Sequence, residues 1–331
     1  MWETWREGWA LAGRRSASAD RADGSADGHH ALESPHAPTA RIVAELKQAR
    51  SKLETAVSRN SMLAPRLAPS IRAFRRIERL LDRPLRVAVI GEFNSGKSSL
   101  ANLMARVESL PTAVVSNTRI PTLLYYARKA EIFAVHQNGK REWLRADLEP
   151  RSHSIFRLEV GLPSQRLRVM QILDFPGLAD PRFPTPFDLA LHDVGAVLWC
   201  TVSTQAWKES ERIAWSQLPS RLWNRGLLVS THGDLLHDTR DVGKLLGRLR
   251  SEASSMFRSI VLISTVDALA LMRAGHQGAS EDAWKATGAE GFETALHDLL
   301  VSVREQRAGA ALRVTSRIAD RALSHIEKQS E

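Results

Sequence analysis

The stretch that decides the fold is Gly91-Glu92-Phe93-Asn94-Ser95-Gly96-Lys97-Ser98, which matches the pattern G-x-x-x-x-G-K-[ST]. It follows an apolar run typical of a strand, residues 85–90, and precedes a helical segment, residues 99–104. The motif needs this context, because its glycines let backbone N–H groups close around phosphate oxygens and the helix amino terminus adds a positive dipole end. The sequence therefore predicts a nucleoside triphosphate site at residues 91–99.

The residue types of this loop assign roles within the predicted site. We expect Lys97 to place its ammonium group on the β- and γ-phosphates, and the Ser98 hydroxyl to bind Mg²⁺. The predicted phosphate-binding residues are Gly91, Asn94, Ser95, Gly96, Lys97, Ser98 and Ser99.

A second motif, Asp174-Phe175-Pro176-Gly177, ends an apolar strand at residues 169–173. A residue at the carboxyl end of such a strand faces the ligand crevice of a doubly wound sheet. We therefore expect Asp174 to hold Mg²⁺ through water and the Gly177 N–H group to contact the γ-phosphate.

Residues 227–234 resemble a strand that ends in the base-reading motif [NT]-K-x-D. Asp234 can accept two hydrogen bonds from guanine N1 and N2, which adenine cannot offer, and this favours GTP. Thr231 stands at the first position of this motif. His232, at the second, replaces the lysine that normally packs beside the base. The alternative is that Asp234 only caps the following helix. Ser264, after a strand at residues 260–264, lies where a loop that touches the base is expected.

The remaining sequence predicts an α/β domain between helical segments. Residues 13–38 are rich in Gly, Ala, Ser, Asp and His without apolar periodicity, as in disordered chains. Two amphipathic helices and then alternating strands and helices follow, which predicts a doubly wound, mostly parallel sheet. Strands are expected at residues 85–90, 122–127, 132–136, 156–160, 167–173, 196–202, 226–230 and 260–264, and helices near 42–57, 63–81, 205–222, 239–257 and 311–326. The predicted parts are a disordered amino-terminal segment (1–38), a helical segment (39–83), the α/β domain (84–304) and a carboxyl-terminal helix (305–331).

Composition restricts the class of protein. The 331 residues contain one cysteine, Cys200, which excludes an internal disulfide and fits a reducing, cytoplasmic setting. No apolar run reaches the roughly 20 residues needed to span a bilayer, and no secretory leader is recognisable. The net charge of +9 comes largely from scattered arginines, so we do not expect a nucleic acid partner.

Tryptophans occur in two groups. Trp2, Trp5 and Trp9 share one face if their segment is helical, and such a face could make peripheral contact with a membrane. It could equally dock on the protein itself or have no role. The second group, Trp199, Trp207 and Trp215, is expected to pack in the core or on its surface. Cys200 is expected to be an inert buried thiol, and the histidines lack metal-ligand spacing.

With these motifs in order, the chain resembles the bacterial dynamin-like GTPases over about residues 40–305. Residues 91–100 are similar to their G-E-F-x-S-G-K-S-[ST]-L, and residues 110–122 to their L-P-T…T-x-x-P-T switch segment. Residues 160–164 and 205–211 also look dynamin-like. The resemblance implies GTP and Mg²⁺ as ligands, with Thr118 completing the Mg²⁺ coordination together with Ser98 and Asp174. It implies a catalytic set of Lys97, Ser98, Thr118 and Gly177.

The resemblance also implies that GTPase domains pair face to face across the nucleotide. The expected partner is a second copy of the chain or a dynamin-like protein that carries a stalk, because only about 25 residues follow residue 305. The helices at 40–82 and 305–328 would form a short bundle like the family's neck. Phe93 stands where eukaryotic dynamins have a glutamine that helps to place the attacking water, so we expect slow hydrolysis without dimerisation.

Three functions are consistent with these residues. The first is a GTPase whose cycle drives assembly of the protein with itself or a partner. This assembly could take place at the inner face of the cell membrane. The second is a GTPase switch acting on RNA or the ribosome. The third is a nucleotide-binding interaction module with negligible turnover, which Phe93 and His232 would suit.

Overall fold

The structure is a computed structural model that describes residues 37–107, 120–145, 155–177, 191–236, 238–274 and 281–327. The segment 1–36 and the switch segment around Thr118 lie outside these residues. The amino-terminal tryptophan group and the predicted disorder of residues 1–36 therefore stay predictions, whereas residues 37 and 38, also expected to be disordered, begin helix α2.

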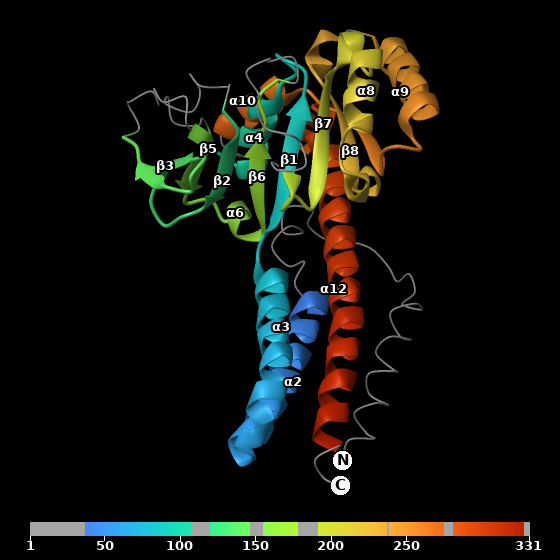
Figure 1. The fold of residues 1–331 in the computed structure, drawn as a ribbon. Helices are drawn as coiled ribbons and strands as arrows, with labels where there is room; N and C mark the ends of the chain where they lie inside the picture. The colour runs from blue at the N-terminus through green and yellow to red at the C-terminus, as the bar shows by residue number, and fades with distance from the viewer. Residues whose placement is uncertain are drawn as a thin grey trace. The chain divides into compact units, whose positions relative to one another are not determined.

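The described residues form a nine-stranded sheet with the order β4-β3-β5-β2-β6-β1-β7-β8-β9 (Figure 1). The central strand β1 is parallel to both neighbours, and β7, β8 and β9 continue in parallel. Strand β2 runs antiparallel to β6, and β3 runs antiparallel to β4 and β5. The α/β class is thus confirmed. The strands are β1 Leu85–Gly91, β2 Thr122–Tyr126, β3 Glu131–His136, β4 Arg141–Trp143, β5 Ile155–Leu162, β6 Met170–Asp174, β7 Ala196–Val202, β8 Gly226–Thr231 and β9 Ser259–Leu262.

Helices cover the sheet and extend beyond it (Figure 1). Their bounds are α2 Ala37–Arg59, α3 Ala64–Asp82, α4 Lys97–Ala105, α6 Arg166–Val169, α8 Glu209–Ser216, α9 Thr239–Ala253, α10 Thr265–Arg273, α11 Glu281–Ala286 and α12 Ala289–Glu327. Among the described residues, no helix is both long and apolar enough to cross a bilayer.

The structure differs from the sequence prediction at residues 167–173 and 205–222, and it adds β4, α10 and α11, which were not predicted. Residues 167–173 were expected to form one strand, but residues 166–169 form the helical turn α6 and only β6 is extended. Leu167 lies in this helical turn and its side chain is fully buried. An apolar residue that is buried in the core therefore does not by itself indicate a strand. The expected helix at 205–222 is shorter, because α8 is followed by a separate 3₁₀ segment, Ser220–Arg225.

The sheet has a core on each face. One core packs α4, α10 and the first half of α12 against the strands. The other contains Trp199, Trp207 and Trp215, all buried, with Trp199 edge-to-face to both others at ring-centroid distances of 6.2 and 5.7 Å. The prediction that these tryptophans are packing residues is confirmed. Cys200, the residue after Trp199 on β7, is buried in the core on the opposite face of the sheet.

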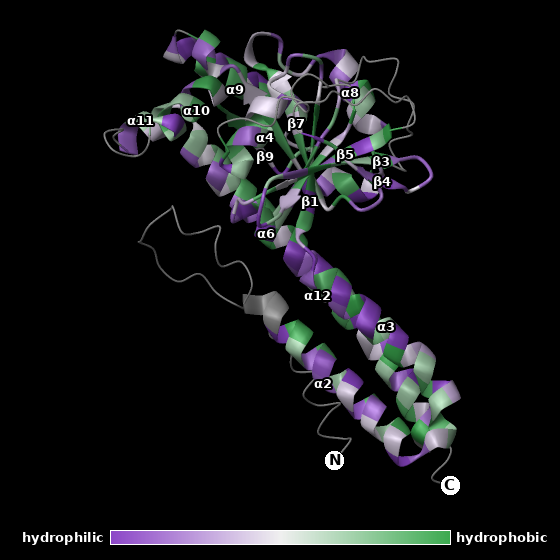
Figure 2. Ribbon diagram, turned by 90° about the vertical axis from the view of Figure 1, so that its left-hand side faces the viewer, coloured by the Kyte–Doolittle hydropathy of each residue, from purple (hydrophilic) through white to green (hydrophobic). Residues whose placement is uncertain are grey.

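Helix α12 joins the α/β domain to a bundle with α2 and α3. Its first half buries Phe292, Leu296 and Leu300 under the sheet, and its second half contacts α2 and α3. This second half buries small residues, which let neighbouring helices approach closely: Ala308, Ala311, Thr315, Ala319 and Ala322. The expected carboxyl-terminal helix is therefore the second half of one continuous 39-residue helix (Figures 1 and 2).

The bundle also contains a cluster of ion pairs between α2 and α3. Arg50 donates to Glu54 at 2.9 Å and to Glu78 at 2.8 Å, and Arg75 donates to Glu54 at 2.8 Å. The hydrogen bond from Arg75 lowers the pKa of Glu54. Beneath these charges, Phe74 of α3 is fully buried. The bundle thus has an apolar interior with a charged seam.

Substitution of Phe74 by alanine is expected to lower the free energy of unfolding by about 3–5 kcal/mol, because it leaves a cavity inside the bundle. The measurement is equilibrium unfolding in urea. Leu80→Ala on the same helix is the control: this side chain is 45% exposed, so a loss of only about 0.5 kcal/mol is expected. Equal effects of the two substitutions would show that α3 does not pack in solution as it does in the structure.

Candidate nucleotide site

The phosphate-binding loop connects β1 to α4 at the centre of the sheet. A Cβ atom on Gly91 would lie 2.2 Å from the carbonyl oxygen of Cys200, so only glycine fits where β1 passes β7. Asn94 and Gly96 have φ angles of 59° and 75°, in the left-handed region. The loop therefore turns sharply and places the first turn of α4 at its mouth.

Lys97 lies inside this loop and is only 8% exposed. Its Nζ atom donates a hydrogen bond to the carbonyl oxygen of Glu92 at 2.5 Å. Burial lowers the pKa of Lys97, whereas the nearby carboxylates of Asp174 and Glu92 oppose this shift. A phosphate is a charged acceptor and binds an ammonium group more strongly than a neutral carbonyl does.

Two of the predicted Mg²⁺ ligands, Ser98 and Asp174, are among the described residues and are in direct contact. The Ser98 hydroxyl donates to Oδ2 of Asp174 at 2.7 Å, although the residues are 76 positions apart. The Oδ1 atom of Asp174 is buried and has no hydrogen-bond partner among the described residues. Burial raises the pKa of Asp174 to about 6, against the lowering effects of the Ser98 hydrogen bond and Lys97.

These oxygens fit Mg²⁺, which is commonly bound through one or two protein oxygens, water and substrate phosphates. Among the described residues, no three His, Cys, Asp or Glu side chains gather to hold a metal by themselves. A magnesium ion here would therefore depend on the nucleotide for further oxygens. Thr118, the third predicted ligand, lies outside the described residues.

Gly177 lies directly against the phosphate-binding loop. A Cβ atom on Gly177 would be 2.9 Å from the Cα and N atoms of Phe93. The backbone of the Asp174 motif thus contacts the loop at the residue that departs from the eukaryotic pattern. The Phe93 side chain is 67% exposed.

The predicted base-reading residues lie on the other side of the loop. The Thr231 hydroxyl, at the end of β8, lies 2.9 Å from the Ser95 carbonyl oxygen and 2.9 Å from Nδ1 of His232. The Ser264 hydroxyl lies 3.2 Å from Oδ1 of Asp234 and 2.7 Å from Oδ2 of Asp267, and it can donate its single hydrogen to only one of them at a time. The tertiary structure therefore brings the two predicted base contacts, Asp234 and Ser264, together.

The alternative role of Asp234 as a cap of the following helix is wrong. Helix α9 begins at Thr239, and its N-cap is Asp238, whose carboxylate accepts from the backbone N–H of Arg240 at 2.9 Å. Asp234 lies earlier, in a short 3₁₀ turn at Gly233–Leu235. Its carboxylate is therefore not required to start α9.

Sequence reasoning missed a second set of contacts on the loop. The Glu92 carboxylate accepts from Lys208 Nζ at 3.0 Å and from the Ser210 hydroxyl at 2.8 Å. These two residues belong to the 205–211 segment that looked dynamin-like but had no assigned role. The segment thus holds the phosphate-binding loop from the side of α8.

Glu211 fixes the shape of that segment. Its buried carboxylate accepts from Trp199 Nε1 at 3.2 Å, Thr201 Oγ1 at 2.8 Å and the Lys208 backbone N–H at 2.9 Å. Burial raises its pKa, and these donors counteract that rise. A glutamate three residues after the N-cap position is the one sequence signal that could have found this contact.

Parts of this chain are similar to known proteins of the dynamin family. Residues 87–168 match the sequence pattern of the dynamin family. Dynamin-like protein 2 of Campylobacter jejuni is 27% identical over 196 residues, which are 57% of this chain and 32% of that protein. The isoniazid-induced protein IniC of Mycobacterium tuberculosis is 32% identical over 111 residues, 31% of this chain and 22% of that protein. The chain thus spans a third or less of the length of these relatives.

A solved structure has the same fold at a TM-score of 0.64 and 18% sequence identity, covering 93% of this chain and 57% of the other. It belongs to an oligomerised bacterial dynamin pair, described as providing a mechanism for long-range sensing and tethering of membranes. The resemblance found in the sequence is confirmed by these matches: residues 87–168 match the dynamin family, and the chain is similar in sequence and fold to bacterial dynamin-like proteins.

Proposed function

We propose that this protein binds GTP with Mg²⁺ and hydrolyses it slowly until two GTPase domains pair. The observation that carries the proposal is the hydrogen bond between Ser98 and Asp174, which unites the loop and the second motif at one point. The buried, unpartnered Oδ1 atom of Asp174 supports a cation there. Lys97, inside the loop, supplies the charge for the phosphates.

The preference for guanine rests on Asp234 and Ser264. The Asp234 carboxylate would accept from guanine N1 and N2, and the Ser264 hydroxyl lies 3.2 Å from that carboxylate. Two charge-assisted hydrogen bonds of this kind discriminate strongly against adenine, which would leave the carboxylate unpaired. His232 would lie beside the base in place of the usual lysine.

Pairing of GTPase domains is supported by Phe93. A large apolar side chain exposed at the phosphate-binding loop has no hydrogen-bonding group to place water, but it provides contact area for a second protein surface. The partner would be a second copy of the chain or a stalk-bearing dynamin-like protein. The similar bacterial pair is oligomerised and tethers membranes, so peripheral membrane association is part of the proposal.

A specific observation also favours a second candidate, an interaction module that binds GTP with negligible turnover. Phe93 and Gly177 are in backbone contact, so the side of the loop where a water-placing residue is expected carries an aromatic ring. Tight binding without hydrolysis at any protein concentration would establish this function.

Lys97→Ala is expected to abolish measurable binding of GTP with Mg²⁺, because the substitution removes the charge that faces the phosphates. Isothermal titration calorimetry of the full chain measures this. Lys244→Ala, which changes an exposed lysine of α9, is the control and should bind as the unchanged protein does. Retained binding by the Lys97 variant would overturn the site assignment.

Asp234→Ala is expected to weaken GTP binding by about tenfold to a hundredfold and to leave ATP binding unchanged, since only guanine loses two charge-assisted bonds. Asp238→Ala is a matched control, because it removes a carboxylate four residues away that caps α9. Competition between GTP and ATP for the site is the measurement. If both variants weaken GTP binding equally, Asp234 does not read the base.

The turnover number for GTP is expected to rise steeply with protein concentration, and Phe93→Ala should flatten this rise while GTP affinity stays within about twofold. Met62→Ala removes a side chain that is also highly exposed, but at the α2–α3 connection, and should leave the rise intact. A flat, near-zero rate with tight GTP binding would favour the interaction module. Stimulation by RNA would instead favour a ribosome-associated switch.

A further inference from the structure

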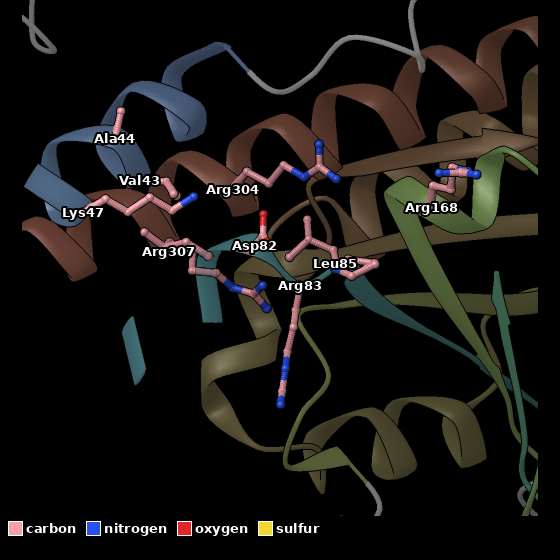
Figure 3. Close-up of a pocket in the computed structure, with 11 residues that line it drawn as sticks. Val43, Ala44, Lys47, Asp82, Arg83, Leu85, Arg168, Arg304 and Arg307 are labelled. Atoms are coloured by element: carbon pink, nitrogen blue, oxygen red, sulfur yellow. The ribbon is translucent and has the colours of Figure 1, made fainter. Parts of the chain in front are cut away.

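A pocket of about 410 Å³ lies where the helical bundle meets the start of β1 (Figure 3). Side chains of α2, α3, α6 and α12 and the first residue of β1 surround it. Its charged lining residues are Lys47, Asp82, Arg83, Arg168, Arg304 and Arg307. The volume is within the range of pockets that hold small ligands, about 300–1,000 Å³.

The lining carries five cationic groups and a single carboxylate, Asp82. Within the described parts of the chain, no carboxylate lies within ion-pair distance of Lys47, Arg83 or Arg307, although the more distant Asp193 acts to raise the pKa of Arg307. Like charges this close repel one another, so the fold gathers them at a cost in stability. An anion in the pocket would remove that cost.

Two of the arginines are fixed in position by backbone contacts. Arg304 Nη2 donates to the carbonyl oxygen of Val169 at 2.7 Å, and Arg307 Nη1 donates to that of Leu80 at 3.3 Å. Arg304 is buried, and burial lowers the pKa of both guanidinium groups, with further lowering of the pKa of Arg304 by Arg307. These positive charges are therefore poorly hydrated, which strengthens their attraction for an anion.

Arg168 adds a third arginine from the opposite wall. Its guanidinium group stacks on the Tyr126 ring at 3.8 Å from the ring centroid, and this contact restricts its position. Planar guanidinium groups with several donors match phosphate oxygens in pairs. Lys47 and Arg83 also line the pocket, and both are exposed.

We propose that this pocket is a binding site for a phosphate-bearing anion, separate from the nucleotide site. The two sites lie at opposite ends of β1, whose seven residues span about 20 Å. The ligand carries phosphate oxygens that the five cationic side chains can bind. It is either a soluble polyphosphate or the headgroup of an anionic phospholipid. By contacting α2, α6 and α12 together, it would hold the bundle on the α/β domain.

The test uses inorganic tripolyphosphate as the probe, without Mg²⁺ and with GDP in excess to compete at the phosphate-binding loop. The double variant Lys47→Gln/Arg83→Gln changes two exposed lining residues and keeps the buried Arg304. It is expected to bind tripolyphosphate about tenfold more weakly than the unchanged chain in calorimetry. The unchanged chain should also gain thermal stability from the probe, and the double variant should gain much less.

The matched control is Arg72→Gln/Arg76→Gln, which removes two exposed positive charges from α3 outside the pocket. It should bind tripolyphosphate as the unchanged chain does. Equal weakening in both double variants would mean that overall charge, not the pocket, attracts the anion and would overturn the proposal. Absence of binding by the unchanged chain would overturn it as well.

Vesicles distinguish the two sources of phosphate. The unchanged chain and the Lys47→Gln/Arg83→Gln variant are sedimented with phosphatidylcholine vesicles that contain about 20% phosphatidylglycerol. Weaker sedimentation of the variant supports a lipid headgroup as the ligand. Equal sedimentation, together with weakened tripolyphosphate binding, supports a soluble phosphate compound. The proposal does not depend on GTP binding. If tripolyphosphate bound only at the phosphate-binding loop, the Lys47→Gln/Arg83→Gln substitutions would not weaken its binding.

Discussion

The close passage of β1 beside β7 is the constraint on which the site depends. Gly91 ends β1 against the carbonyl oxygen of Cys200, with no room for a side chain. Because β1 is also parallel to β6, the carboxyl ends of three neighbouring strands meet at one edge. That edge supplies Lys97 from the loop, Asp174 from β6 and the 205–211 segment that follows β7. The chemistry of the site therefore follows from the order of strands in the sheet.

The loop is held from several directions, which explains how a strained turn stays in place. Glu92 is bound by Lys208 and Ser210, Ser95 is approached by Thr231, and Phe93 lies against Gly177. Each contact comes from a different strand end. The loop is therefore in contact with the segments that follow β6, β7 and β8.

Helix α12 connects the α/β domain to the helical bundle. Its large apolar residues lie under the sheet and its small residues lie in the bundle, so one rigid element belongs to both parts. The cationic pocket lies beside this helix (Figure 3). It is lined by Leu85, the first residue of β1, whereas the nucleotide loop follows the last residue of that strand. Strand β1 and helix α12 thus connect two regions of opposite charge: the buried Asp174 carboxylate lies near one end of β1, and five cationic side chains line the pocket at the other.

The sequence by itself determined the strand–loop–helix at residues 85–104, the α/β class and the two helices before β1, because these depend on local patterns. It also proposed Ser98, Asp174, Asp234 and Ser264 as members of one site. Only the tertiary structure showed that Ser98 meets Asp174, and that Glu92 is held by Lys208. It alone decided that α12 is continuous and that Lys47, Arg168 and Arg304 share a pocket. Such contacts join residues far apart in the chain, and their pairing is set by strand order and helix packing, which local periodicity does not encode.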